Sequence, residues 1–272
     1  MRNQTAEQAA IAAAGDLAVQ LKIHDPDVGV ILGTGWGDKL SLTDERSISF
    51  EQVPGFGELQ PLEGHSRKFV AGSCGGKSVV VLSGRVHLNE APADPMIYEM
   101  VRLQTETLMQ LGIRKLIVTC AAGALPKSGV QTGDLVVIDG FITLFAPDMP
   151  LYAGEFCSPE DALSPELQAM AFMTQHEGFD IVRKAGYAMV RGPFFETRKY
   201  DKRAIRRTGA SIVGMSTLPE TCIAALYDAK VLALAFITND SVEVHSHQIN
   251  LERARKASNG LGAYLQRIIE QI

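Results

Sequence analysis

Three short segments of the sequence carry residue types that bind oxyanions, and the first is a glycine turn. The apolar run Val28–Leu32 leads into Gly33-Thr-Gly-Trp-Gly37. Backbone N–H groups of such a turn can reach an anion, and the Thr34 hydroxyl adds a donor, although glycines can also serve a tight turn alone. The dinucleotide fingerprint G-x-G-x-x-G needs glycine where Asp38 stands, and no Gly-Lys-Ser/Thr of the triphosphate loop follows. The turn therefore favours a small oxyanion.

The second and third segments are Gly64-His65 and Gly84-Arg-Val-His87. Alternate side chains of extended chain share a face, so Arg85 and His87 should point the same way. A guanidinium offers phosphate two parallel donors, and an imidazole adds one directed donor. Each histidine alone would more often be an ordinary surface or core residue. Their combination with a glycine turn predicts a phosphate site.

A fourth segment, Arg191-Gly-Pro-Phe-Phe-Glu-Thr197, combines aromatic rings with one carboxylate. A flat apolar face beside an acid can stack a heterocycle and accept a hydrogen bond from its N–H. The alternative is that Phe195 lies in the core and Glu196 caps a helix. The residues alone leave both interpretations open.

Alternating strands and helices must position these segments. Apolar runs bounded by turn residues predict strands at 28–32, 68–71, 78–82, 115–119, 134–138, 186–190, 211–213 and 231–238. Helical periodicity predicts helices at 6–22, 95–111, 197–208, 218–229 and 250–271. Thr5 and Gln8 have capping-box spacing at the first helix, and Asp94 caps the second, whose first residue is Pro95.

This alternation predicts an α/β fold with a central, mixed and largely buried β-sheet flanked by helices. Residues 38–66 are polar, contain turn signals and are expected to be irregular. Met96, Met100, Leu103, Leu108 and Leu111 should form most of the buried face of the second helix. With no linker or internal repeat, residues 1–272 are expected to form one domain.

The composition limits the classes of molecule that the protein is expected to bind. The chain has 272 residues with 46% hydrophobic and 21% charged side chains, and its net charge of -5 provides no basic field for nucleic acid. No apolar run approaches the roughly 20 residues that span a bilayer, so we expect no membrane partner. The four cysteines lack CxxC spacing, which indicates free thiols in a reducing cytoplasm and no metal site.

The motifs, taken together, resemble those of the trimeric, low-molecular-mass purine nucleoside phosphorylases. The resemblance runs from about residue 28 to the C-terminus, and the motifs occur in the order found in that family. They are Gly33-Thr-Gly35, Gly64-His65, Gly84-Arg-x-His87, Thr119-Cys-Ala-Ala-Gly123, Gly192-Pro-Phe-Phe-Glu-Thr197, Gly214-Met-Ser-Thr-x-Pro-Glu220 and Ile237-Thr-Asn239. Such an ordered set is highly specific.

The resemblance implies a role for each matching position. The phosphate ligands would be Thr34 (usually Ser in the family), His65, Arg85, His87, the N–H of Ala121, and Ser216. Phe195 would stack on the purine, Glu196 would accept its N1–H, and Asn239 would bind its N7/O6 edge. The ribose would meet Asn89, Met215 and His247, with His245 as an alternative in the last place. His87, Glu196 and Asn239 would be the catalytic residues.

The resemblance also implies a homotrimer, no metal and no organic cofactor, with inorganic phosphate as a substrate. Phe156 matches the phenylalanine that completes the neighbouring subunit's site. Three positions depart from the family pattern: Asn89 replaces a usual Tyr, Cys120 a usual Asn, and Asp240 a common Lys.

The implied activity is phosphorolysis of 6-oxopurine nucleosides such as inosine and guanosine, giving the free base and (deoxy)ribose 1-phosphate through a ribosyl cation-like transition state. One alternative is methylthioadenosine phosphorylase, which resembles this chain but carries Asp at the place of Asn239 and lacks Glu196. Another is a non-catalytic nucleoside-binding protein on the same fold. A dinucleotide-dependent oxidoreductase is disfavoured by Asp38.

Overall fold

A nine-stranded mixed sheet forms the centre of the protein. The computed structural model describes residues 2–36, 40–57, 66–180, 182–240, 243–244 and 246–272. The strands are β1 (Val28–Leu32), β2 (Thr43–Ser49), β3 (Lys68–Cys74), β4 (Lys77–Ser83), β5 (Lys115–Ala124), β6 (Leu135–Ile142), β7 (Val182–Met189), β8 (Ile212–Gly214) and β9 (Lys230–Asn239). The predicted fold class, α/β with a mixed sheet, is confirmed.

The sheet has an open half and a closed half. The strand order is β2-β3-β4-β1-β5-β8-β7-β6-β9, and β9 also pairs with β5, which closes the last five strands into a ring. Within this arrangement β4, β1, β5 and β9 run parallel. Their carboxyl ends therefore meet at one edge, the usual place for a ligand in a parallel sheet.

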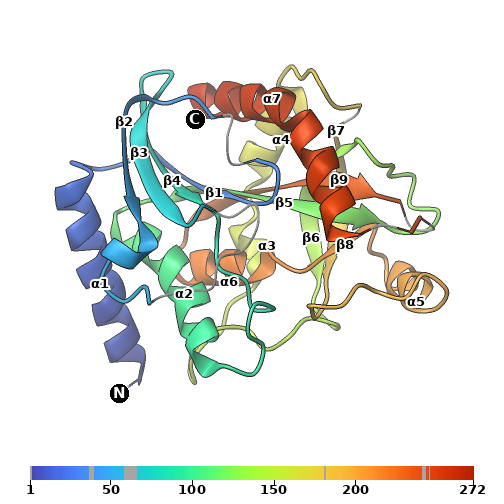
Figure 1. The fold of residues 1–272 in the computed structure, drawn as a ribbon, viewed down its shortest axis with the longest axis horizontal. Helices are drawn as coiled ribbons and strands as arrows, with labels where there is room; N and C mark the ends of the chain where they lie inside the picture. Colours follow the sequence, from blue (N-terminus) through green and yellow to red (C-terminus); the bar gives the residue numbers. More distant parts are fainter. Residues whose placement is uncertain (1, 37–39, 58–65, 181, 241–242, 245) are drawn as a thin grey trace.

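Helices cover both faces of the sheet. They are α1 (Arg2–Gln20), α2 (Pro95–Gln110), α3 (Pro159–Ala162), α4 (Pro165–Met173), α5 (Asp201–Arg207), α6 (Leu218–Leu226) and α7 (His247–Gln271). The helices α1, α2, α3 and α6 pack on one face, and α4 and α7 pack on the other (Figure 1). The short α5 lies on the opposite side of the molecule from α1 (Figure 1). Among the described residues, no helix is both long and apolar enough to cross a bilayer.

The uninterrupted apolar run of β1 follows from its position between two cores. All five of its residues are buried, and successive side chains alternate between the faces, because the period of a strand is two residues. Ile31 joins the core under α1 and α2, while Val30 joins the core under α4 and α7. A strand that is buried on both faces needs apolar residues at every position.

Several predicted elements are confirmed. β1 has the predicted bounds, and β3 and β4 form the predicted pair around Gly75 and Gly76. Asp94 caps α2, since its carboxylate accepts a hydrogen bond from the Met96 N–H at 3.0 Å.

Other predictions are wrong at their boundaries. Residues 38–66 are not wholly irregular, because β2 and a 3-10 helix at Phe50–Gln52 lie within them. β2 is mostly exposed and polar, so its sequence lacks the alternation of apolar and polar residues that would predict a strand. α1 already begins at Arg2, which places Thr5 inside the helix rather than at its cap. Met96 is 54% exposed and does not belong to the buried face of α2.

The helices of the second half also differ from the prediction. α5 is shorter than the predicted helix 197–208, and α3 and α4 were not predicted. α7 begins at His247, three residues before the predicted start, because the Ser246 hydroxyl caps it by accepting from the Ile249 N–H at 3.3 Å. This earlier start moves His247 from a loop to the first turn of a helix.

The close contact between the glycine turn and α7 yields the first prediction. Gly35 has φ of 84°, and a Cβ at this position would lie 2.1 Å from the Ala254 Cβ. Gly76 has φ of 79° but meets nothing within 4 Å, so it is a matched control. We expect Gly76→Ala to lose roughly 1 kcal/mol of unfolding free energy from backbone strain, and Gly35→Ala at least about 2 kcal/mol because overpacking adds to it. Urea unfolding measures both; equal losses would contradict the contact.

Candidate active site

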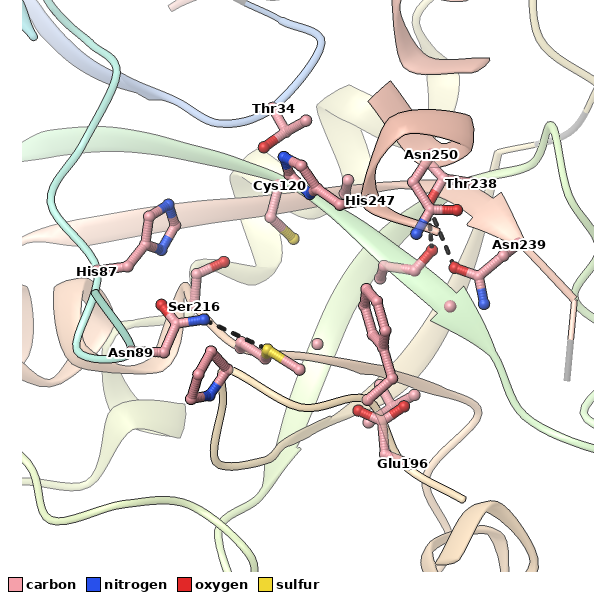
Figure 2. A pocket seen from close by; sticks show the side chains of 18 of the residues that line it. Thr34, His87, Asn89, Cys120, Glu196, Ser216, Thr238, Asn239, His247 and Asn250 are labelled. Atoms are coloured by element: carbon pink, nitrogen blue, oxygen red, sulfur yellow. Dashed lines mark hydrogen bonds between the residues drawn. The ribbon is translucent and has the colours of Figure 1, made fainter. Parts of the chain in front are cut away.

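One cavity of about 490 Å³ lies at the edge where the parallel strands end. Its walls come from segments that follow β1, β4 and β7, from the ends of β5, β8 and β9, and from the first turn of α7. The lining residues that could contact a ligand through a side chain include Thr34, Arg85, His87, Asn89, Glu90, Cys120, Phe195, Glu196, Met215, Ser216, Thr238, Asn239, His247 and Asn250. In Figure 2, His87, Asn89 and Ser216 lie on one side of the pocket, and Glu196 and Asn239 lie on the other.

The glycine turn is fastened to β5 and presents Thr34 to the cavity. The Gly33 N–H donates to the Thr119 Oγ1 at 3.0 Å, and the Trp36 indole N–H donates to the Cys120 carbonyl at 3.1 Å. A Cβ on Gly33 would lie 2.6 Å from the Arg85 Nη2, so only glycine leaves room for that guanidinium. The first glycine therefore serves packing, whereas Thr34 lines the pocket.

Arg85 is a fully buried cation that follows β4 by two residues. Its Nη1 donates to the Glu220 Oε1 at 2.8 Å, and its Nη2 donates to the Thr119 carbonyl. Both partners are buried as well, so the ion pair lies in a region of low dielectric constant where its attraction is strong. These two bonds fix the plane of the guanidinium at the cavity wall.

The turn after β4 is closed by Glu90. Its carboxylate accepts from the His87 N–H at 2.8 Å and pairs with Arg67. Burial raises the pKa of the Glu90 carboxyl, although the His87 N–H and the Arg67 guanidinium act against that shift. Glu90 was not predicted as a site residue, but its spacing of three residues from His87 is that of an acid closing a turn. This contact orients the His87 backbone.

The beginning of α6 lies next to the same end of the pocket. Ser216 lines the cavity, and its N–H donates to the Tyr187 hydroxyl at 3.2 Å. Thr217, the N-cap residue, is fully buried and has φ of 76°. The N-terminus of a helix carries partial positive charge and stabilises a nearby anion. Together with Arg85, His87 and the Ser216 hydroxyl, it gives this end of the cavity several hydrogen-bond donors suited to an anion.

The opposite end carries an acid and an amide. Asn239 ends β9 and is 4% exposed, and the Thr238 hydroxyl donates to its Oδ1 at 3.4 Å (Figure 2). Glu196 and Phe195 come from the segment after β7. Burial raises the pKa of the Glu196 carboxyl, while its own backbone N–H and the nearby Lys202 act against the shift. This end can pair with a polar heterocycle through both a carboxylate and an amide.

Asn89, Met215 and the first turn of α7 also line the pocket. The Asn89 Nδ2 donates to the Met215 Sδ at 3.4 Å. His247 and Asn250 are three residues apart in the first turn of α7, so both lie on the face that meets the cavity. Asn250 was not predicted; once a helix start is placed at position 247, this spacing indicates it.

The cavity brings together every predicted site residue except His65 and Phe156. His65, like the alternative His245, lies outside the described residues. Phe156 is 92% exposed and does not line the cavity of its own chain. The three residues that depart from the family pattern do not all lie in the cavity, and Asn89 is part of its lining. Cys120 lines the cavity, whereas Asp240 accepts from the Thr132 N–H at 3.1 Å and is not part of the lining.

The chain belongs to the Phosphorylase superfamily, whose family model matches residues 27–270. It is therefore an enzyme of that superfamily. Curated relatives include the purine nucleoside phosphorylases of Mycobacterium tuberculosis, 31% identical over 264 residues (94% of each chain), and of Rattus norvegicus, 30% identical over 268 residues (92% of this chain and 90% of the relative).

Solved structures agree with this assignment. A Schistosoma mansoni purine nucleoside phosphorylase in complex with inosine has a TM-score of 0.83 at 26% identity, covering 97% of this chain and 96% of that one. A structure of the Schistosoma mansoni enzyme in complex with adenosine has a TM-score of 0.82 at 25% identity, covering 97% of both chains. The fold of this chain is thus that of known purine nucleoside phosphorylases.

The buried pair of Arg85 and Glu220 yields the second prediction. Glu220→Gln removes the negative charge and leaves a buried cation without its ionic partner, so we expect a loss of roughly 3 kcal/mol in unfolding free energy. Glu166→Gln is the matched control, because the Lys230–Glu166 pair is exposed, at 57% and 74%, and should contribute under about 1 kcal/mol. Chemical unfolding of both variants is the measurement. Equal stability of the two would refute the energetic importance of the buried pair.

Proposed function

We propose that the protein catalyses phosphorolysis of 6-oxopurine nucleosides, such as inosine and guanosine, to the free base and (deoxy)ribose 1-phosphate. The observation that carries this proposal is the division of one cavity into an end rich in hydrogen-bond donors and an end with a carboxylate and an amide. Phosphate would bind at the first end and a purine at the second. The sugar would lie between them, beside Met215 and His247. Phosphate is a substrate here, and the proposal needs no metal or organic cofactor.

At the phosphate end, the chain's groups would hold the nucleophile below the sugar. We propose Thr34, Arg85, His87, the Ala121 N–H and Ser216 as ligands, together with His65. Arg85 is already fixed by Glu220 and Thr119, so little of its freedom is lost when phosphate binds. Holding the nucleophile in line with the breaking C1′–N9 bond turns a bimolecular step into an effectively unimolecular one.

At the base end, the departing purine gains negative charge as the C1′–N9 bond breaks. The Asn239 amide can donate to N7, and this hydrogen bond strengthens as the base becomes anionic. Phe195 would stack on the ring. The positive charge that develops on the ribosyl group would face the bound phosphate. Both charges of the transition state thus meet groups of opposite sign or suitable donors.

Glu196 gives the preference for 6-oxopurines. A carboxylate accepts a hydrogen bond from the N1–H of hypoxanthine or guanine, whereas the bare N1 of adenine offers it no proton. An unmet polar group in a buried site costs about 1–3 kcal/mol. We therefore expect inosine and guanosine to be preferred over adenosine and methylthioadenosine.

We also propose a homotrimer in which Phe156 completes the site of a neighbouring subunit. The loop before it is anchored, since the Glu155 carboxylate accepts from the Arg102 Nη1 at 2.7 Å and from the Tyr152 N–H at 2.8 Å. Phe156 itself projects outward and is 92% exposed. A large apolar side chain held out from an anchored loop is suited to bury itself against another chain.

The third prediction concerns activity and the base end. Purified protein should release hypoxanthine from inosine only when phosphate is present. Glu196→Ala and Asn239→Ala should each lower kcat/KM for inosine by about tenfold or more, because each removes a hydrogen bond to the base in the transition state. Steady-state kinetics with inosine, guanosine, adenosine and methylthioadenosine side by side is the measurement.

Matched controls for these variants are Glu252→Ala and Asn259→Ala, which change exposed residues of α7 and should leave kcat/KM unchanged. Near-normal kinetics in both site variants would rule out the proposed base contacts. Turnover without phosphate, or none with any nucleoside, would overturn the proposed reaction. A higher kcat/KM for methylthioadenosine than for inosine would instead favour the alternative, a methylthioadenosine phosphorylase.

The fourth prediction concerns assembly. Analytical ultracentrifugation should give a particle of three chains, each of 29.4 kDa. Phe156→Ala should raise the KM for inosine severalfold, since aromatic contacts are often among the strongest at an interface. The control, Phe172→Ala, alters a side chain that is 51% exposed on α4 and should not change KM. A monomeric wild-type protein would contradict the proposed trimer. An unchanged KM in Phe156→Ala would contradict the proposed role of Phe156.

A further inference from the structure

A buried lysine packs against the segment that carries Glu196, because the Lys202 N–H donates to the carbonyl of Thr197, the residue after Glu196, at 3.2 Å. Lys202, in α5, has no exposed surface, and its Nζ makes no hydrogen bond with any residue that the structure describes. An ammonium group without partners is costly to bury, so lysines rarely occupy such positions unless an opposite charge is near. Its position therefore requires an explanation in terms of the charges around it.

Glu196 is the principal acid that acts on this lysine. Burial lowers the pKa of Lys202, and among the surrounding charges Glu196 opposes that shift most strongly, followed by Glu243 and Asp240, while Arg198 adds to it. The other two acids have partners of their own. Glu243 pairs with Arg253, and Asp240 accepts from the Thr132 N–H.

The relation is reciprocal at Glu196. Of the charged side chains that shift the Glu196 pKa, Lys202 is a cation and Asp201 an acid. Lys202 does not line the cavity, whereas Glu196 does, so the acid and not the lysine would contact a ligand there. Asp240 occupies a position where purine nucleoside phosphorylases commonly have lysine, and it adds negative charge beside Asn239. In this chain the compensating cation comes from α5.

We propose that Lys202 is a positioning residue that keeps Glu196 a carboxylate, and so a hydrogen-bond acceptor, when a purine covers it. The inference rests on the proposed function, because it concerns the proton state in which Glu196 recognises the N1–H of a 6-oxopurine. Bound base excludes water from Glu196 and by itself favours the protonated acid. The charge of Lys202 opposes that effect.

The sign of the effect follows from the two proton states. Ionised Glu196 accepts from the N1–H of hypoxanthine, whereas protonated Glu196 has a proton to donate and suits the bare N1 of adenine. Removing Lys202 raises the Glu196 pKa, so activity with inosine is lost at a higher pH as the solution is acidified. The preference for inosine over adenosine should weaken over the same interval.

The test compares Lys202→Met with Lys202→Arg, which keeps the charge, and with Lys199→Met, which removes an exposed lysine from the same segment. The acid limb of kcat/KM for inosine should move up by about one pH unit in Lys202→Met. It should stay in place in Lys199→Met and return towards the wild-type position in Lys202→Arg. A limb that does not move in folded Lys202→Met overturns the proposal, since a merely structural role would lower activity at every pH alike.

A second measurement does not depend on turnover. Carbon-13 NMR follows the carboxyl carbon of Glu196, assigned with Glu196→Gln, during a pH titration without substrate. Its midpoint should lie below neutral pH in the wild type and about one unit higher in Lys202→Met, or in Lys202→Gln if the first variant does not fold. Equal midpoints, or a wild-type midpoint above neutral pH, would overturn the role of Lys202. Absence of inosine turnover in the wild type would instead reject the proposed function and leave this titration to decide the proton state.

Discussion

The buried ion pair between Arg85 and Glu220 is the interaction on which the geometry of the pocket depends. Arg85 follows β4, Glu220 lies in the first turn of α6, and the second donor of the guanidinium reaches β5 through the Thr119 carbonyl. Taking both charges out of water is expensive, and this cost is offset by their mutual attraction at 2.8 Å and by the hydrogen bond from Arg85 to the Thr119 carbonyl. One side chain thereby sets the distance between the strand edge and the helix whose N-terminus faces the same cavity.

The two ends of the cavity use burial in opposite ways. At the end proposed for phosphate, the buried Arg85 is paired with Glu220, and the further donors are imidazole, hydroxyl and backbone groups. At the end proposed for the base, burial raises the pKa of the Glu196 carboxyl, and the buried cation Lys202 opposes that shift. A single pocket can therefore hold an anion at one end and a carboxylate at the other without strong mutual repulsion.

Much of this arrangement follows from the residues, and the exceptions have physical causes. The motif order located the cavity because its side chains lie at strand ends, where glycine and polar residues interrupt apolar runs. The alternation rule could not find β2, since it has little buried surface to pattern. Glu90 and Asn250 were missed because their roles come from a turn and a helix start, which single residues do not reveal. Lys202 was missed because charge in an amphipathic segment ordinarily faces solvent.

The ring formed by β5, β8, β7, β6 and β9 leaves the described sheet with one free margin, the outer side of β2. A free margin exposes unpaired backbone donors and acceptors that a second molecule could extend into a continuous ribbon. Here that margin carries Asp44, Glu45 and Arg46, which are exposed. Charged side chains on an edge strand oppose edge-to-edge pairing between molecules, and β2 therefore protects the margin that the ring leaves open.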